Sequence, residues 1–293
     1  MAQNDGPQRP DDRSTTSYEM GVELSVWPAL KVRRAEQLAA ELGAAVNLWW
    51  QAANVRTEFS EGGDANTAYL LLRVDEAPAV LQWSLLFGDF VHNLRAALDA
   101  LTWELATYDG RQPEYPTRVA FPICTEPDDW KERRWDKWLA SVPADALERI
   151  KDAQPYQRVH DEPHVALALI SKLDNLDKHR SSVRVRLHTN GTPSVLAKFK
   201  DESRGGTFQP AYISDAPLRD GVPIVRLESD RPIASLEATG ALPLAARVDI
   251  DERSYDLSDL LDGLVTQVQN TMATIMLDRP DDSTGRHVGD AST

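Results

Sequence analysis

Cysteine and long apolar runs are both scarce in this sequence, and each shortage excludes a class of protein. Cys124 is the only cysteine among 293 residues, so an intramolecular disulfide and a cysteine-based zinc site are excluded. No run of about 18 apolar residues occurs, which argues against a membrane-spanning helix. The polar start of the chain lacks the apolar core of a signal peptide. We therefore expect a soluble, cytoplasmic protein with no membrane partner.

Familiar catalytic signatures and excess positive charge are also missing. The chain has no glycine-rich phosphate loop, no Gly-x-Ser-x-Gly elbow, no His-Glu-x-x-His pair and no dinucleotide-binding fingerprint. The 46 Asp and Glu residues outnumber the 32 Lys and Arg residues, which gives a net charge of −14. Such a molecule repels nucleic acid, so binding a polyanion would need a local basic patch. We predict no cofactor.

The hydrophobic pattern predicts an α+β fold, in which a helical bundle is followed by an antiparallel β-sheet region in the C-terminal half and a closing C-terminal helix. Apolar residues recur at helical spacing in the first half, and a Glu-Gly-Gly-Asp turn predicts one hairpin within 54–75. Alternating runs then predict strands, and a stripe from Leu257 to Ile275 predicts the last helix. The other expected elements are helices from a cap at Ser25, at 79–106 and 161–180, two short helices in 127–152 broken at Pro143, and strands near 183–187, 194–200, 208–213, 222–228, 233–238 and 243–250.

Composition divides the chain into four parts. Residues 1–17 and 279–293 are polar and aperiodic, so we expect disordered tails. Residues 18–180 form the mainly helical region, and residues 181–278 form the antiparallel β region with the closing helix. The sequence contains no internal repeat.

One predicted helix contains the stretch GDFVHNLRAALDALTWEL at 88–105. His92, Arg95 and Asp99 are spaced i, i+3 and i+7, so they lie in one line on the helix surface. This line runs beside the apolar stripe of the same helix. We therefore expect these three polar side chains at the edge of the packed face.

A second predicted helix ends in DNLDKHR at 174–180. Helical spacing continues its apolar stripe to Asp177 and Arg180, which should point partly inward. Buried charges need partners, because an unpaired ion inside a protein costs several kcal/mol. We therefore expect the two helices to pack with Arg95 against Asp177 and Arg180 against Asp99.

The two motifs resemble those of a family of uncharacterised bacterial proteins that pair a Gly-Asp-x-x-His-Asn-Leu-Arg-x-Ala-Leu-Asp helix with an Asp-Lys-His-Arg helix end. The likeness covers roughly residues 80–181 and implies no established activity. The chain also resembles HEPN domains, helical bundles that often act as metal-independent ribonucleases through an Arg-x4–6-His motif. Arg158 and His164 match that spacing. This second resemblance implies ribonuclease chemistry.

The polar residues of the two helices allow three interpretations. They form an ion-pair network that only fixes helix register, or a catalytic or anion-binding site, or a metal site that uses the i, i+3 pair Asp89 and His92. Arg95 and Lys178 oppose the metal interpretation, and we predict no metal. A histidine beside arginines can protonate a leaving group while a phosphate is neutralised. Our candidate catalytic residues are therefore His92, Arg95, Asp99, Asp177, His179 and Arg180.

A basic segment follows the second helix. Seven Lys and Arg residues occur between Lys178 and Arg204, against two acidic residues. If the strands at 183–187 and 194–200 pair as a hairpin, their basic side chains form one patch beside the helix end. The alternative is the solvated face of an amphipathic hairpin. Our candidate phosphate-binding residues are Lys178, Arg184, Arg186 and Lys198, and the candidate partner is RNA or another phosphate-containing ligand.

Whether the chain is an enzyme stays open at this stage. The leading hypothesis is an anion-binding or phosphodiester-processing site between the two helices, and the alternative is a non-catalytic interaction protein. Other residues of chemical interest receive structural interpretations. These are a solvated helix cap for His160 and His164, a buried position for Cys124, and core or interface packing rather than base stacking for Trp130, Trp135 and Trp138.

Overall fold

The computed structural model describes most of the chain between residues 26 and 276. The described residues are 26–158, 162–179, 184–191, 193–201, 203, 206–212, 218–242 and 244–276, without the side chains of 158, 162–165, 177–179 and 210–212. Both predicted tails lie outside these ranges.

The order of elements confirms the predicted α+β fold, with most of its antiparallel strands in the second half and a helix at the end. The helices are α1 (Trp27–Ala52), α2 (Val80–Ala106), η1 (Pro116–Arg118), α3 (Asp129–Glu132), α4 (Trp135–Trp138), α5 (Ala144–Asp152), η2 (Pro155–Arg158), α6 (Glu162–His179) and α7 (Leu257–Met276). The strands are β1 (Arg56–Glu61), β2 (Thr67–Arg73), β3 (Val185–Thr189), β4 (Ser194–Phe199), β5 (Phe208–Tyr212), β6 (Pro223–Ser229), β7 (Ile233–Thr239), β8 (Leu244–Ile250) and β9 (Arg253–Asp256).

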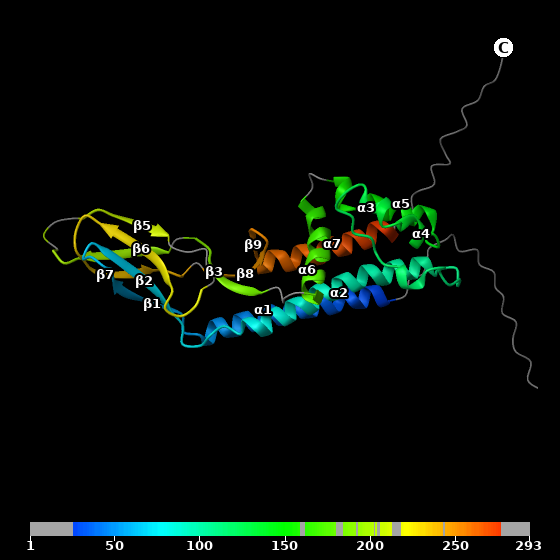
Figure 1. Cartoon of the computed structure of the whole chain (residues 1–293). Coiled ribbons are helices and arrows are strands. Elements are labelled where there is room, and N and C mark those ends of the chain that lie inside the picture. Colours follow the sequence, from blue (N-terminus) through cyan, green and yellow to red (C-terminus); the bar gives the residue numbers. More distant parts are fainter. Residues whose placement is uncertain are drawn as a thin grey trace, which may run out of the picture.

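Helices α1 and α2 pack side by side along the molecule (Figure 1). Their apolar residues recur every three or four positions, so each helix buries one continuous stripe. Trp49 of α1 meets Trp83 of α2 edge to face at 5.6 Å. Helices α6 and α7 pack against this pair and complete the helical bundle. Pro28 lies in the first turn of α1, as expected. The N-cap of α1 is Val26, and the expected cap, Ser25, lies outside the described residues.

The strands form three antiparallel sheets. The largest has the order β1-β2-β6-β5, a second has the order β3-β8-β9, and β4 pairs with β7. The predicted hairpin at 54–75 is confirmed as β1 and β2, and β2 also pairs with β6 from the second half of the chain. Figure 1 shows the large sheet at one end of the molecule and α3, α4 and α5 at the other.

The first two strands after α6 do not form the hairpin that a single basic patch would require. β3 pairs with β8, and β4 pairs with β7, so the two strands belong to different sheets. Alternation correctly predicts that Val185 and Leu187 are buried. It says nothing about partners, because a buried face can be covered by any strand with a matching apolar face.

The segment 127–152 contains three short helices instead of the two that were predicted. The expected break at Pro143 is present, since this residue caps α5. A further break separates α3 from α4 at Arg134, whose backbone is left-handed with φ of 61° and ψ of 38°. An arginine gives no sequence signal for such a turn, because left-handed backbone is normally adopted by glycine or asparagine.

Candidate functional site

Arg95 and Asp99 of α2 together hold one backbone residue of the loop that follows η1. Arg95 Nη2 donates a hydrogen bond to the carbonyl oxygen of Phe121 at 2.7 Å, and the Phe121 N–H donates to Asp99 Oδ1 at 2.8 Å. The two side chains also pair with each other, with 3.0 Å between Arg95 Nη2 and Asp99 Oδ1. Together they provide hydrogen-bond partners for both backbone groups of Phe121, as a neighbouring β-strand would. The fully buried Phe121 side chain is thereby fixed in the core.

The predicted cross-helix pairs are not described by the structure. The side chain of Asp177 and all of Arg180 lie outside the described residues, as do the side chains of Lys178 and His179. Pairing of Arg95 with Asp177 and of Asp99 with Arg180 therefore stays a prediction. The contacts that are described support a positioning role for Arg95 and Asp99.

His92 contacts the second helix through a carboxylate. Its Nδ1 lies 3.2 Å from Asp174 Oδ1 of α6. The two side chains differ in exposure: His92 is 53% exposed and Asp174 is 7% exposed. A carboxylate acceptor favours the tautomer with hydrogen on Nδ1, which leaves Nε2 as a hydrogen-bond acceptor. Because His92 is half-exposed and its Nδ1 is engaged, the imidazole can exchange a proton with a ligand through Nε2.

Asp174 is the residue that sequence reasoning ranked too low. It lies one turn before Asp177 in α6, on a face next to the apolar stripe, and is not among the candidate catalytic residues predicted from sequence. The sequence signal that could have identified Asp174 is the presence of a histidine in the first motif helix and a carboxylate in the second, which can pair when the two helices pack together. Asp89, which was paired with His92 in the metal interpretation, is exposed on α2. Its backbone carbonyl oxygen accepts a hydrogen bond from Asn93 at 2.8 Å.

Two of the candidate phosphate-binding residues, Arg186 and Lys198, lie on separate sheets. Arg184 precedes β3 and is exposed, whereas Arg186 on β3 lies 3.9 Å from Asp249 of β8. Lys198 is exposed on β4, which pairs with β7. Since β3 and β4 do not form a hairpin, these residues do not share the single strand-pair face on which the predicted patch depended. His188, two residues after Arg186 on β3, is buried, and its Nε2 lies 3.2 Å from Asp249 Oδ2.

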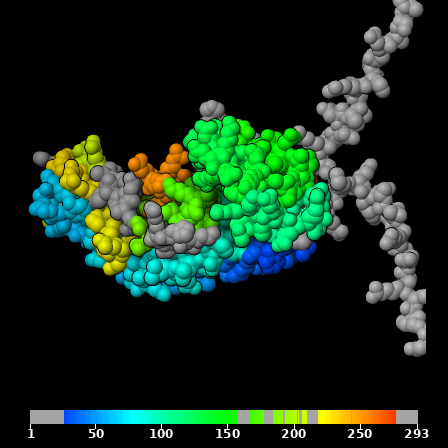
Figure 2. All heavy atoms as spheres, turned by 45° about the vertical axis from the view of Figure 1, so that its right-hand side comes forward, coloured from blue at the N-terminus to red at the C-terminus, as the bar shows by residue number. Residues whose placement is uncertain are grey.

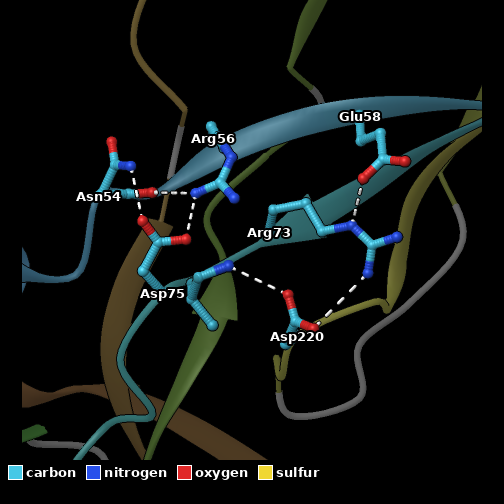
Figure 3. Close-up of polar contacts among 7 residues, drawn as sticks. Asn54, Arg56, Glu58, Arg73, Asp75 and Asp220 are labelled. Carbon is cyan, nitrogen blue, oxygen red and sulfur yellow. Dashed lines mark hydrogen bonds and ion pairs between the residues drawn. The ribbon is translucent and has the colours of Figure 1, made fainter.

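A second polar cluster joins the end of α1 to the hairpin β1–β2 (Figure 3). Asn54 donates to one oxygen of Asp75 at 2.8 Å, and Arg56 binds the other oxygen. These hydrogen bonds lower the pKa of Asp75. Arg56 and Asp75 therefore each have a partner within the cluster. This part of the cluster links α1 to the sheet and leaves neither charged group free for a ligand.

The same cluster continues along β2. Arg73 binds Glu58 of β1 and lies 3.5 Å from Asp220, whose other oxygen accepts the Val74 N–H at 3.2 Å (Figure 3). These contacts raise the pKa of Arg73, chiefly through the hydrogen bond to Glu58. The carboxylates are more than half exposed, and exposed ion pairs contribute little to stability. We interpret this part as a link between the hairpin and the start of β6.

Two hollows flank the first half of α7. One of about 1040 Å³ lies between α1, β8 and α7, and one of about 830 Å³ lies between β9 and α7. Glu36, Asp256 and Asp262 contribute carboxylates to the larger one, and no Lys or Arg is among its described lining residues. Its charge therefore disfavours a phosphate. Neither His92 nor Asp174 belongs to the described lining of either hollow.

The comparisons with known proteins give no match. No family model, no curated protein and no solved structure is similar to this chain. Within the described part of the chain, no group of three or more His, Cys, Asp or Glu side chains could hold a metal ion, and no helix is long and apolar enough to cross a membrane. The side chains of Arg158 and His164, which match the HEPN spacing, lie outside the described residues. Function is therefore argued from side-chain geometry.

Cys124 is expected to be chemically inert in the folded protein. It is fully buried, and burial raises the pKa of its thiol to about 11. The thiolate is the reactive form of cysteine, so almost none is available at pH 8. Treatment with a disulfide reagent at pH 8 should modify the native protein very slowly and the denatured protein within minutes, as measured by mass spectrometry. Rapid modification of the native protein would contradict the burial of this thiol.

Proposed function

We propose that the contact of α2 with α6 is a proton-transfer site that acts on a phosphate-containing ligand, with His92 as general acid or base. One observation carries the proposal: a half-exposed histidine is oriented by an almost fully buried carboxylate from another helix. A buried carboxylate stabilises the imidazolium that forms when the histidine takes up a proton. A purely structural pair would not need the remaining ring edge to reach solvent.

The roles of the neighbouring residues follow from their contacts. Asp174 orients the ring through Nδ1, so Nε2 removes a proton from an attacking oxygen while a new P–O bond forms and the bond to the leaving oxygen breaks. The leaving oxygen takes its proton from solvent. Arg95 and Asp99 hold the loop around Phe121 and thus position the flank of the site. Lys178 and Arg180, which follow Asp174 in the sequence, are expected to balance the phosphate charge.

The proposal is tested with two phosphodiester probes, a labelled single-stranded RNA and bis(p-nitrophenyl) phosphate. His92→Gln should lower the rate of cleavage by about 100-fold or more, because general acid–base catalysis contributes about 10²–10⁴-fold. Asp174→Asn should lower it less, since the ring remains but its orientation weakens. Asp89→Asn, which changes an exposed carboxylate one turn away on α2, serves as the matched control.

The outcomes separate catalysis from scaffolding. Catalysis predicts that His92→Gln keeps the melting temperature of the unaltered protein while cleavage is lost, and that Asp89→Asn cleaves normally. If the unaltered protein cleaves neither probe, or if His92→Gln cleaves as fast as the unaltered protein, the proposal is wrong. A large loss of thermal stability in both His92→Gln and Asp174→Asn would favour the alternative, a non-catalytic interaction protein whose polar contacts are structural.

A further inference from the structure

Five side chains form an aromatic–cation cluster around α4, far along the chain from His92. They are Tyr115, Arg118, Arg134, Lys137 and Trp138. Arg118 and Arg134 lie 5.7 Å and 5.6 Å from the centre of the Trp138 ring, and Lys137 lies 4.4 Å from that of Tyr115. Tyr115 and Trp138 meet edge to face at 4.9 Å. Three positive charges therefore gather on two aromatic rings, at distances typical of cation–π contacts.

None of these three cations has a carboxylate partner among the described residues. Two neighbouring basic residues do have one: Arg133 lies 3.8 Å from Asp129, and Lys151 lies 2.8 Å from Asp136. In a chain with a net charge of −14, carboxylates are abundant. Three unpaired cations packed together repel each other, and an anion placed between them would remove that repulsion.

Backbone strain supports the same interpretation. Arg134 adopts left-handed backbone with φ of 61°, a conformation that glycine adopts without strain and arginine does not. Strain of this kind persists where the surroundings enforce it, and it concentrates at functional sites. The next turn is fixed by Trp138, whose Nε1 donates to the carbonyl oxygen of Arg133 at 2.6 Å. The exposed Arg134 guanidinium is thereby held over the ring instead of extending freely into solvent.

A pocket of about 420 Å³ lies beside the cluster. Its lining contains aromatic rings, the Ser141 hydroxyl and charges of both signs. The aromatic residues are Tyr108, Tyr115 and Trp138, the cations are Arg111 and Lys137, and the carboxylates are Asp109, which pairs with Arg111, and Glu114. The Ser141 hydroxyl is buried without a hydrogen-bond partner among the described residues. The volume falls within the range of about 300–1,000 Å³ that small-molecule sites have. Aromatic walls, polar side chains of both charges and a hydroxyl without a described partner suit a flat polar ring that carries no net charge.

We propose that the aromatic–cation cluster binds a nucleoside phosphate, with the phosphate against Arg118 and Arg134 and the base in the adjacent pocket. Aromatic rings beside a positively charged track are the usual means of binding single-stranded nucleic acid. The lobe that carries the cluster lies at the end of the molecule opposite the large sheet, as Figure 2 also shows. The inference does not rest on the function proposed for His92, since its test measures binding alone.

The test uses the full chain and three probes: AMP, a labelled single-stranded RNA of ten nucleotides, and an acidic peptide of equal charge. Binding is followed by calorimetry for AMP and by fluorescence anisotropy for the other two. Neutralisation of three phosphates predicts a log–log salt slope of about −2 for the single strand. Binding of AMP identifies a nucleotide site and binding of the RNA alone identifies a nucleic-acid site, and either result supports the proposal.

Arg134→Gly is the decisive variant, because it removes the guanidinium and also relieves the left-handed strain. It should weaken RNA binding and make the salt slope less negative by about 0.7, while the melting temperature stays equal or rises. Arg118→Gln should weaken binding similarly. Arg219→Gln is the control, since it removes one exposed charge just before β6, near the large sheet.

Four results would overturn the proposal. The first is the absence of binding by both AMP and RNA at low salt. The second is equal binding of the acidic peptide, which would mean that the cluster recognises charge without a base. The third is unchanged RNA affinity in Arg134→Gly, because binding would then occur elsewhere. The fourth is a loss in Arg219→Gln as large as in Arg134→Gly, because binding would then depend on net charge.

Discussion

Replacement of Phe121 by alanine is expected to lower the free energy of unfolding by about 3–5 kcal/mol, the usual cost of truncating a buried phenylalanine. The side chain is fully buried. Its backbone is held on both sides, by Arg95 at the carbonyl and by Asp99 at the amide. The loop therefore cannot move inward to fill the space, and most of the cavity should remain. Chemical denaturation followed by circular dichroism measures the change.

The control for this prediction keeps the apolar character of the side chain. Phe121→Leu should cost clearly less than Phe121→Ala, since a smaller cavity remains. Val119→Ala, in the same loop but only half-buried, should also cost less. A loss below about 1 kcal/mol for Phe121→Ala would show that the loop relaxes freely, and the proposed grip by Arg95 and Asp99 would then be weak.

The elements that depend on local pattern were predictable from sequence. The spacing and the breakers after residue 106 predict a helix at 79–106, and α2 is Val80–Ala106. The second motif helix was expected at 161–180, and α6 is Glu162–His179. Both periodicities follow from the geometry of a single helix, so no knowledge of neighbours is needed. Strands β3 to β8 were predicted from local alternation, whereas β9 (Arg253–Asp256) was not predicted.

What could not be predicted depends on neighbours distant in the chain. β3 pairs with β8, more than fifty residues away, instead of with β4. A hairpin with the next strand is the simplest local pairing. The partner is decided instead by which strand offers a matching apolar face in the folded protein, and that strand can be distant in the sequence. The extra break at Arg134 was missed for another reason: the residue type contradicts the backbone that it adopts. A conflict of this kind cannot be seen in a hydrophobic pattern.

In the candidate site, too, the features that follow from local spacing were predictable and those that depend on distant neighbours were not. The line of His92, Arg95 and Asp99 was visible from helical spacing, and so was the need for partners. The contacts of Arg95 and Asp99 with the backbone of Phe121 were not visible, because a backbone amide has no residue-specific signature. Inference from charge alone favours carboxylate–guanidinium pairs between helices and does not consider backbone groups as partners.

The second large effect is expected from Arg95 and Asp99 themselves. Arg95→Ala should lower the free energy of unfolding by about 2–3 kcal/mol, since it leaves the buried Phe121 carbonyl without its donor and Asp99 without its ion pair. Asp99→Ala should cost about 1–3 kcal/mol, because the Phe121 amide then loses its acceptor. Asp99 is 36% exposed, so both values are below the cost of breaking a fully buried ion pair.

A double-mutant cycle tests whether the two residues act together. Because both bind Phe121 and each other, the double variant should cost less than the sum of the single variants, with a coupling energy of about 1–2 kcal/mol. The cycle of Arg95 with Asp177 provides the comparison. If Arg95 couples to Asp177 more strongly than to Asp99, the cross-helix pair predicted from sequence dominates, and the grip on Phe121 is secondary. Coupling near zero in both cycles would contradict a structural role for the pair, because the three groups would then be energetically independent.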